Sequence, residues 1–450
     1  MTAAVDLAVV GAGIAGLSAA WAAHRRGLSV AVLESGDTVG GKIGTYSAGG
    51  YQCENGPNSF VGSASTIWRL IDELGLTSEV LPASGSGDRY IYRGRSARRL
   101  PRSPGDLFSS SDFLSIRGKL RMLCEPFIFG NAREDDTILT FATRRLGKEA
   151  ARYLVSPFVS GIYAGDADML GARDAFPQLW QWEFDAGSIA IGALLKRRKK
   201  RPSRRGIFTF RSGFQTLTHA IATQLPHESI HLQTPVTQVQ RLPDRGFHLQ
   251  FEGGELLAER VIVATPPRQA ASLLPPKVAH LQEALLNVQF CSLAVVHCGG
   301  PILDGTPPEG FGMLIPPGEG LRTLGILFPS SVFPQRAPQG HWLHSGFLGG
   351  ARDPDAVELP DETLLSLVLR AQDQAFAHNN LTCDFLRVCR WPEAIPQYTV
   401  GHRQRMQQVR AELEREVPGM SLAGNWLDGV SVNDAAASGI AAVDRLFGAP

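Results

Sequence analysis

The stretch VDLAVVGAGIAGLSAAWAAHRRGLSVAVLE, residues 5–34, decides the fold of this chain. It starts with a β-rich run at 5–10, which ends in the glycine turn GAGIAG at 11–16. An alanine-rich segment, 17–26, stops at a glycine, which is a common helix terminus. A second apolar run, 29–33, ends in an acidic residue. Strand, glycine turn, helix and parallel strand within about 30 residues predict the βαβ unit of a dinucleotide-binding domain.

The glycine turn and the acidic residue after it indicate the kind of ligand. Gly11 permits a tight turn, Gly13 lets a diphosphate approach the backbone, and Gly16 lets the helix pack closely on the strand. The start of the helix offers free N–H groups and a partial positive charge to phosphates. Glu34 can accept hydrogen bonds from both ribose hydroxyls, and it would repel a 2′-phosphate. The unit therefore predicts a dinucleotide other than NADP.

Two further segments favour FAD over NAD. The segment GGKIGT, 40–45, can give the diphosphate more backbone donors and, through Lys42, a counter-charge that simple NAD dehydrogenases do not need. Near the C-terminus, AGN at 423–425 precedes GVSVND at 429–434 and a helix of small residues. Such a strand, turn and helix can point backbone N–H groups at the pyrimidine end of an isoalloxazine, where they favour hydride acceptance. The sequence thus predicts non-covalent FAD.

Length and composition limit the other possibilities. The 450 residues exceed the size at which one hydrophobic core stops growing, so two or three lobes are expected. Charged residues make up 19% and the net charge is +1, so the overall electrostatic potential of the chain does not favour binding of nucleic acid. No two of the six cysteines have C-x-x-C spacing, so neither a zinc site nor a redox dithiol is predicted. Six cysteines in 450 residues are typical of an intracellular protein with reduced thiols. Neither a signal peptide nor about 18 consecutive apolar residues occurs, so we expect a protein that is cytoplasmic or lies on a membrane without crossing it.

Periodicity divides the remaining chain into helical and β-rich regions. Helical patterns cover 60–80 and 111–200, with a short strand at 90–92 between them. A basic run follows at 196–205. Strands are predicted at 207–210, 236–239, 247–251 and 261–263, a mixed region at 285–400, and a last strand at 421–425 before the closing helix. Because both ends of the chain have the same strand–turn–helix character, we expect one domain built from separated segments.

Several short segments resemble the protoporphyrinogen oxidase family. This family lies in the monoamine-oxidase/phytoene-desaturase branch of the glutathione-reductase-like flavoproteins. The segments occur in the family's order over nearly the whole chain, and the second and the last are the most specific. They are ENGPNSF at 54–60, SGIYAGD at 160–166, GFGML at 310–314, FLGGA at 347–351, and RW at 390–391 leading to IPQY at 395–398.

The resemblance implies an α/β, multi-lobe architecture. It consists of a glutathione-reductase-like Rossmann FAD domain, a mixed-sheet substrate domain and a helical membrane-facing lobe. The FAD domain is discontinuous and takes 1–90, 206–266 and 415–450. The mostly helical lobe takes 91–205, and the substrate domain takes 267–414.

The resemblance also implies site residues, which fall into a cofactor set and a substrate set. The cofactor set is Gly11, Ala12, Gly13, Ile14, Ala15, Gly16, Glu34, Ser35, Lys42, Gly56, Pro57, Asn58, Ser59, Val236, Trp391, Val430, Ser431 and Val432. The substrate set is Asn58, Ala164, Gly165, Phe311, Leu314, Ile326 and Phe347. One departure concerns the substrate propionate, which many members hold with an arginine shortly after a Leu-Pro step. No arginine aligns cleanly after Leu100, so Arg98, Arg99 or Arg102 would have to substitute.

The implied reaction is the oxidation of protoporphyrinogen IX to protoporphyrin IX in haem biosynthesis. Removing six electrons and six protons takes three rounds of a two-electron flavin. Dioxygen is the expected acceptor, with hydrogen peroxide as the product, and a bacterial respiratory acceptor is the alternative. A hydride passes to flavin N5, and no dedicated catalytic acid or base is expected, which agrees with the scattered histidines. The resemblance places the protein peripherally on the inner face of the cytoplasmic membrane and leaves its oligomeric state, a homodimer included, open.

Three alternatives remain open from the sequence. The first is oxidation of coproporphyrinogen III, which carries more propionates and would favour more cations around the cavity. The second is a flavin amine oxidase or a carotenoid desaturase, in which Trp391 and Tyr398 could form an aromatic cage. The third is a scaffold that binds FAD without turnover.

The basic run at 196–205 also has three interpretations. A solvated loop is the simplest, and attraction to anionic lipid is the next. Nucleic acid is disfavoured because no aromatic residues alternate with the charges.

Overall fold

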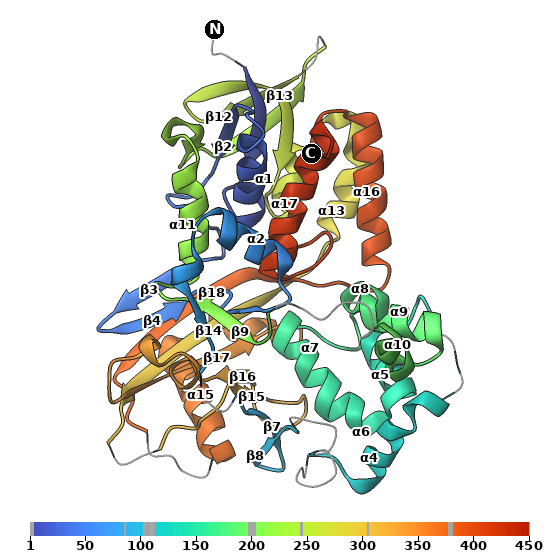
Figure 1. The fold of residues 1–450 in the computed structure, drawn as a ribbon, viewed down its shortest axis with the longest axis vertical. Coiled ribbons are helices and arrows are strands. Elements are labelled where there is room, and N and C mark those ends of the chain that lie inside the picture. The colour runs from blue at the N-terminus through green and yellow to red at the C-terminus, as the bar shows by residue number, and fades with distance from the viewer. Residues whose placement is uncertain are drawn as a thin grey trace.

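The computed structural model describes residues 4–84, 87–101, 106, 113–128, 130, 132–196, 204–243, 246–303, 306–376 and 381–449. Over these residues the chain forms two seven-stranded sheets, a three-stranded sheet and a two-stranded sheet, together with many helices. Figure 1 shows the first large sheet at one end of the molecule, and the second large sheet beside a group of helices at the other end. This arrangement confirms the predicted α/β, multi-lobe fold class.

The first large sheet contains the predicted βαβ unit. Its strands in spatial order are β10 (Ile230–His231), β2 (Val30–Leu33), β1 (Val5–Val10), β13 (Gly254–Val263), β12 (Phe247–Phe251) and β11 (Val236–Arg241), with β19 (Met420–Leu422) beside β13. Strand β1 runs parallel to β2 and β13, and Val9 lies opposite Val32 and Ile262. The predicted strands at 5–10 and 29–33 are confirmed, because strands buried on both faces read as continuous apolar runs. The predicted strands at 236–239 and 247–251 are also present as β11 and β12, although these two strands are partly exposed.

Helices cover both faces of this sheet. Leu7 and Val9 pack in one core with α1 (Ile14–His24), α2 (Ser65–Glu73), α11 (Gln215–Gln224) and α17 (Val432–Phe447). Ala8 and Val10 point to the other face, where α12 (Pro267–Leu273), α13 (Ala279–Leu286) and α16 (His402–Glu416) complete a second core. Helix α1 begins at Ile14, earlier than the alanine-rich segment predicted, because the last residue of the glycine turn already lies in its first turn.

The second large sheet is built mainly from the C-terminal half of the chain. Its strands in spatial order are β18 (Phe385–Pro396), β14 (Phe290–Pro301), β17 (His341–Gly349), β16 (Thr323–Leu327), β15 (Gly312–Leu314), β7 (Arg89–Arg93) and β8 (Ser96–Arg99). Helix α15 (Asp361–Phe376) packs on one face of it. Strands β7 and β8 belong to this sheet. The predicted boundary after residue 90 instead assigns Arg89 and Tyr90 to the FAD domain and the rest of both strands to the helical lobe. The three-lobe division remains a proposal.

The predicted helical region at 111–200 is confirmed over its described residues. It contains α4 (Ile116–Leu123), η2 (Glu125–Phe127), α5 (Ile138–Leu146), α6 (Lys148–Ala150), the π-helical η3 (Ala151–Val155), α7 (Ser156–Tyr163), α8 (Ala172–Ala175), α9 (Pro177–Ala186) and α10 (Ile189–Lys196). We call these elements the helical lobe. Arg145 is fully buried at its centre and pairs with Glu125, while Arg144 pairs with Asp136 and Glu183. No helix in the described part of the chain is long and apolar enough to cross a membrane.

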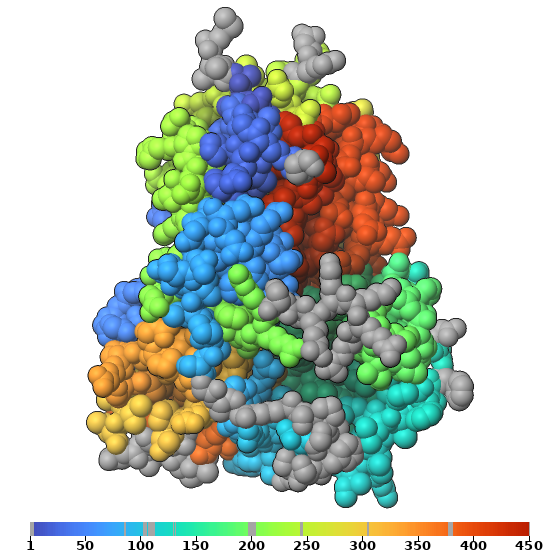
Figure 2. Space-filling model, in the orientation of Figure 1, coloured from blue at the N-terminus to red at the C-terminus, as the bar shows by residue number. Residues whose placement is uncertain are grey.

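The smaller elements connect these units. Strands β3 (Thr45–Ala48) and β4 (Tyr51–Glu54) form the two-stranded sheet, and β5 (Phe60–Val61), β9 (Ile207–Phe210) and β6 (Val80–Pro82) form the three-stranded one. Short helical turns are η1 (Thr77–Glu79), η4 (His227–Ser229), η5 (Pro276–Val278), α14 (Pro329–Val332), η6 (Pro334–Arg336) and η7 (Pro354–Glu358). Figure 2 shows the N-terminal segment in blue packed against the C-terminal segment in red at the same end of the molecule.

Candidate functional site

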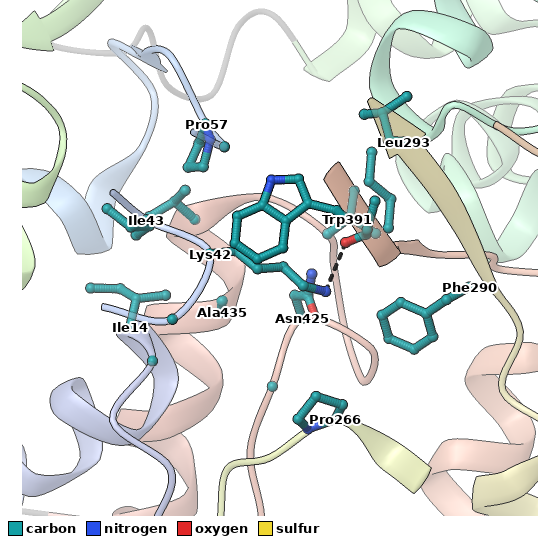
Figure 3. A pocket seen from close by; sticks show the side chains of 18 of the residues that line it. Ile14, Lys42, Ile43, Pro57, Pro266, Phe290, Leu293, Trp391, Asn425 and Ala435 are labelled. Carbon is teal, nitrogen blue, oxygen red and sulfur yellow. Dashed lines mark hydrogen bonds between the residues drawn. The ribbon is translucent and has the colours of Figure 1, made fainter. Parts of the chain in front are cut away.

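A cavity of about 900 Å³ lies between the two large sheets. Its wall at one end comes from the glycine turn after β1, the end of β2 and the start of α17. At the other end the wall comes from β14 to β18 of the second sheet and from α7. Ligands of open α/β sheets bind beyond the carboxyl ends of the parallel strands, and this cavity lies at that edge of the first sheet. Figure 3 shows part of the wall.

Each of the three glycine positions in the turn requires a glycine for a different reason. Gly11 has a φ of +103°, and a Cβ there would lie 3.1 Å from the Ala264 carbonyl oxygen. A Cβ on Gly16 would lie 1.9 Å from the Gly11 carbonyl oxygen, so the helix could not approach the strand. Gly13 has an ordinary φ of −68°, and a Cβ there would meet nothing within 4 Å. Protein packing therefore does not require a glycine at this position, whereas a diphosphate approaching the start of α1 through the cavity would require it.

Glu34 is held at the end of β2 by backbone donors. Its Oε2 accepts a hydrogen bond from the Ala12 N–H at 2.6 Å, and its Oε1 accepts one from the Gly36 N–H at 2.8 Å. The Ser35 hydroxyl also donates to Oε1 at 3.2 Å, so of the about four lone-pair sites of the carboxylate, one on Oε2 remains for a ribose hydroxyl. The residues present at this end of the cavity thus fit the adenosine diphosphate part of a dinucleotide.

The side chain of Lys42 extends toward the second sheet. Its Nζ donates a hydrogen bond to the Ala394 carbonyl oxygen at 2.8 Å and lies 4.9 Å from the centre of the Phe290 ring. Figure 3 shows it running beneath the Trp391 indole. Burial lowers the pKa of Lys42 from 10.5 to about 8.

Trp391 and the start of α17 form the wall between the two ends of the cavity. The Trp391 Nε1 donates to the Asn55 carbonyl oxygen at 2.7 Å, which fixes the plane of the indole. Ser431 caps α17, because its Oγ accepts from the Asp434 N–H at 3.2 Å. The first amides of a helix have no partner within the helix, so this end offers donors to an anionic or carbonyl-bearing group.

The far end of the cavity is apolar. Phe311, Leu314, Ile326 and Phe347 line it together with residues of β14. Helix α7 closes it from the side and approaches closely, since a Cβ on Gly161 would lie 2.8 Å from Leu314 Cδ2. An apolar wall with few polar groups suits a large, mostly apolar ligand.

The cavity brings together nearly all the predicted site residues. Of the cofactor set, only Ala12 and Gly16 do not line it, since the Ala12 amide holds Glu34 and Gly16 packs under Gly11. Of the substrate set, only Gly165 lies outside the wall, where a Cβ would be 2.6 Å from Gln397 Oε1. The binding roles assigned to both sets stay predictions.

The structure adds one cation that the sequence analysis missed. Arg89 on β7 places its guanidinium carbon 5.4 Å from the centre of the Phe311 ring, a wall residue of the cavity. Of the arginines predicted instead, Arg99 pairs with Asp88 at 2.7 Å, Arg98 lies outside the wall, and Arg102 lies outside the described residues. Pairing of β7 with β15, which sets Arg89 opposite Gly312, brings this exposed arginine next to Phe311, although Arg89, like Arg98, does not itself line the cavity. No local sequence signal predicts that pairing.

Comparisons with known proteins agree with this geometry. A family profile described as flavin containing amine oxidoreductase matches residues 14–447. A mitochondrial protoporphyrinogen oxidase from Nicotiana tabacum is 30% identical over 98% of this chain and 94% of the relative. A coproporphyrinogen III oxidase from Bacillus subtilis is 31% identical over 97% of this chain and 96% of the relative.

Solved structures show the same fold. A candidate protoporphyrinogen oxidase from Exiguobacterium sp. 255-15 superposes with a TM-score of 0.85, at 28% identity and 99% coverage of both chains. A putrescine oxidase superposes with a TM-score of 0.75 at 18% identity, over 98% of both chains, and this likeness concerns the fold alone.

Proposed function

The chain belongs to the flavin containing amine oxidoreductase family and uses FAD, and from this premise we propose that it oxidises protoporphyrinogen IX to protoporphyrin IX. The observation that carries the proposal is one continuous cavity that joins the dinucleotide turn to a broad apolar wall. A porphyrinogen is apolar in its body and anionic at its propionates. The apolar wall fits the body, and Arg89, an exposed residue that contacts the Phe311 ring from outside the wall, is the cation that we propose for the propionate rim.

In this proposal the residues of the chain have two tasks, which are to hold the macrocycle and to separate it from the nucleotide end. FAD, when bound, supplies a two-electron acceptor, and we propose dioxygen as its oxidant, so that one porphyrinogen consumes three dioxygen molecules and yields three of hydrogen peroxide. Phe311 and Phe347 hold the macrocycle, and Trp391 separates it from the nucleotide end. Among the described residues of the apolar wall there is no histidine, aspartate or glutamate. We propose that pyrrole protons pass to water or move by tautomerism, without a dedicated acid or base.

Coproporphyrinogen III is the second candidate substrate. The Bacillus subtilis relative and one from Propionibacterium freudenreichii, 30% identical, are both named for it. An amine substrate is less well supported by the geometry, because an aromatic cage would need Tyr398 beside Trp391. Tyr398 is fully buried, stacks on His402 and lies outside the cavity wall.

Anaerobic reduction of the bound flavin tests the proposal. The purified yellow protein is mixed under nitrogen with protoporphyrinogen IX or coproporphyrinogen III in separate cuvettes. We expect the flavin to bleach and porphyrin fluorescence to grow when air is admitted, with the faster reaction for protoporphyrinogen IX. A faster reaction with coproporphyrinogen III would select the second candidate. A flavin that dithionite reduces but neither porphyrinogen bleaches would overturn both.

We also propose that the helical lobe lies on an anionic membrane surface. Ile116 on α4 and Phe127 on η2 are each 77% exposed, and both elements adjoin one another. Of the basic run, residues 197–203 lie outside the described residues, while Lys196 pairs with Asp185.

Sedimentation with vesicles of neutral or anionic lipid tests this proposal. Phe127→Asp should reduce binding to anionic vesicles, whereas Leu303→Asp, at an exposed apolar residue after β14, should not. Equal binding of both variants would contradict it.

A further inference from the structure

Lys42 lies at a local irregularity of the second sheet. Strands β14 and β18 pair antiparallel, but their register shifts between Cys291 and Leu293. Bulges of this kind disrupt the ladder and redirect the groups of the bulged strand, and they are common beside active sites. The Ala394 carbonyl oxygen, which lies in this stretch of β18, accepts a hydrogen bond from the Lys42 Nζ.

Within the described part of the chain, no carboxylate lies at ion-pair distance from the Lys42 ammonium group. Its partner at 2.8 Å is a neutral carbonyl. The neighbouring carboxylate, Glu393, pairs with Arg268 at 3.6 Å. The other titratable neighbour is Cys291, and burial raises the pKa of its thiol to about 11, so this group is neutral at ordinary pH. An ammonium group in such a place interacts strongly with any new negative charge nearby, because little water screens it.

Lys42 is also placed where new negative charge would arise. It lines the cavity beside Trp391, between the nucleotide end and the apolar wall (Figure 3). We infer that Lys42 is the charged group at the reacting end of the cavity, where its ammonium group favours the arrival of electrons on bound FAD. Lys42 transfers no proton to the substrate and forms no bond. The inference does not depend on which substrate is oxidised.

A loss of this charge at alkaline pH gives the inference a measurable signature. Burial lowers the pKa of Lys42 to about 8, while Glu393 opposes that shift. If reduction of FAD places negative charge beside the ammonium group, it raises the affinity of Lys42 for its proton. The reduction potential should then fall more steeply with pH above about pH 8, because reduction takes up one further proton there.

Measurement of the reduction potential against redox dyes, without any porphyrinogen, tests the inference from pH 6 to 10. Lys42→Met should lower the potential at pH 7 and abolish the steep segment above pH 8. Lys42→Arg, which stays charged throughout, should keep the high potential and also lack the segment. Glu393→Gln, which removes a carboxylate that favours the charged amine, should move the segment to lower pH.

Two outcomes would overturn the inference. One is a Lys42→Met holoenzyme that has an unchanged potential and pH profile but releases FAD more easily, which would make Lys42 a counter-charge for the diphosphate. The other, if Lys42→Met does not retain FAD, is a Glu393→Gln protein whose profile equals that of the wild type. Because no substrate enters the experiment, these outcomes are independent of the porphyrinogen test.

Discussion

Gly13 and Gly16 show that one motif combines two separate requirements. A side chain at Gly16 would collide with the Gly11 carbonyl group in the turn that follows β1, whereas a side chain at Gly13 would enter the open cavity. The fold therefore requires a glycine at Gly16, and the bound ligand requires a glycine at Gly13. Sequence cannot separate them, since both are simply glycines of the same motif.

Gly13→Ala should therefore leave the apoprotein folded and reduce its affinity for FAD by ten-fold or more, because a methyl group would occupy the space of the diphosphate. Titration of the apoprotein with FAD, followed by flavin fluorescence, measures the affinity. Gly16→Ala is the matched control and should lower the thermal stability of the apoprotein itself. Full FAD affinity in folded Gly13→Ala protein would show that the diphosphate does not approach this residue.

Arg89 is the residue through which we expect the substrate propionate to be held. Arg89→Gln should raise the KM for the porphyrinogen by about ten-fold, since a charge-assisted hydrogen bond contributes about 1.5–3 kcal/mol and each 1.4 kcal/mol is about ten-fold. Steady-state kinetics measure KM, and the flavin spectrum should not change. Arg99→Gln, at an arginine already paired with Asp88, is the control and should change KM less. An equal effect of both substitutions would contradict a specific role for Arg89.

Helix α2 shows how one element depends on another that is distant in sequence. Its N-cap residue, Ala64, makes no side-chain cap. The cap comes instead from α17, where the Asn433 Oδ1 accepts hydrogen bonds from the Thr66 N–H at 2.9 Å and the Ile67 N–H at 3.4 Å. The closing helix thereby ties the start of α2 to the residues next to the cavity.

Asn433→Ala should lower the free energy of unfolding by about 1 kcal/mol, which is the usual contribution of a helix N-cap. The rate of hydrogen exchange should increase most at the amides of Thr66 and Ile67, because these amides lose their acceptor. Asn433→Asp keeps an acceptor oxygen and should retain most of the protection. Unchanged exchange in Asn433→Ala would mean that these amides find another partner.

The N-terminal and C-terminal segments of the chain pack against each other in one domain. Strands from residues 5–10, 254–263 and 420–422 lie together in the first sheet. Helix α17 packs so closely on α1 that a Cβ on Gly439 would lie 1.9 Å from the Ala15 carbonyl oxygen. The FAD end of the cavity is thus complete only when both ends of the chain are folded together.

Three buried histidines should make the stability of the whole molecule depend on pH. Burial lowers the pKa of His297, His344 and His402 from 6.5 to about 4. The unfolded chain binds protons at these residues below about pH 6.5, whereas the folded protein does so only near pH 4. Their contribution is therefore complete above pH 6.5 and declines as the pH falls toward 4. Urea midpoints should be lower at pH 5 than at pH 7.

A variant of one buried histidine checks this explanation. His344 packs between Phe328 and Trp342, so His344→Phe preserves an aromatic ring there. The loss of stability between pH 7 and pH 5 should be smaller in this variant than in the wild type. His219→Asn, at an exposed histidine of α11, should leave that difference unchanged. A difference in His344→Phe as large as in the wild type would assign the pH dependence to other groups.

The sequence by itself determined the dinucleotide unit, the FAD cofactor and most of the cavity wall. These features depend on local patterns: a buried strand, a glycine turn and an acidic residue a fixed distance along the chain, or short motifs such as SGIYAGD at 160–166. Only the tertiary structure decided the position of Arg89, the direction of Lys42 and the burial of Tyr398 away from the cavity. Each of these depends on strand pairing or a register shift between segments far apart in the chain. Such contacts carry no local signal, because they form only when separate hydrophobic surfaces pack together.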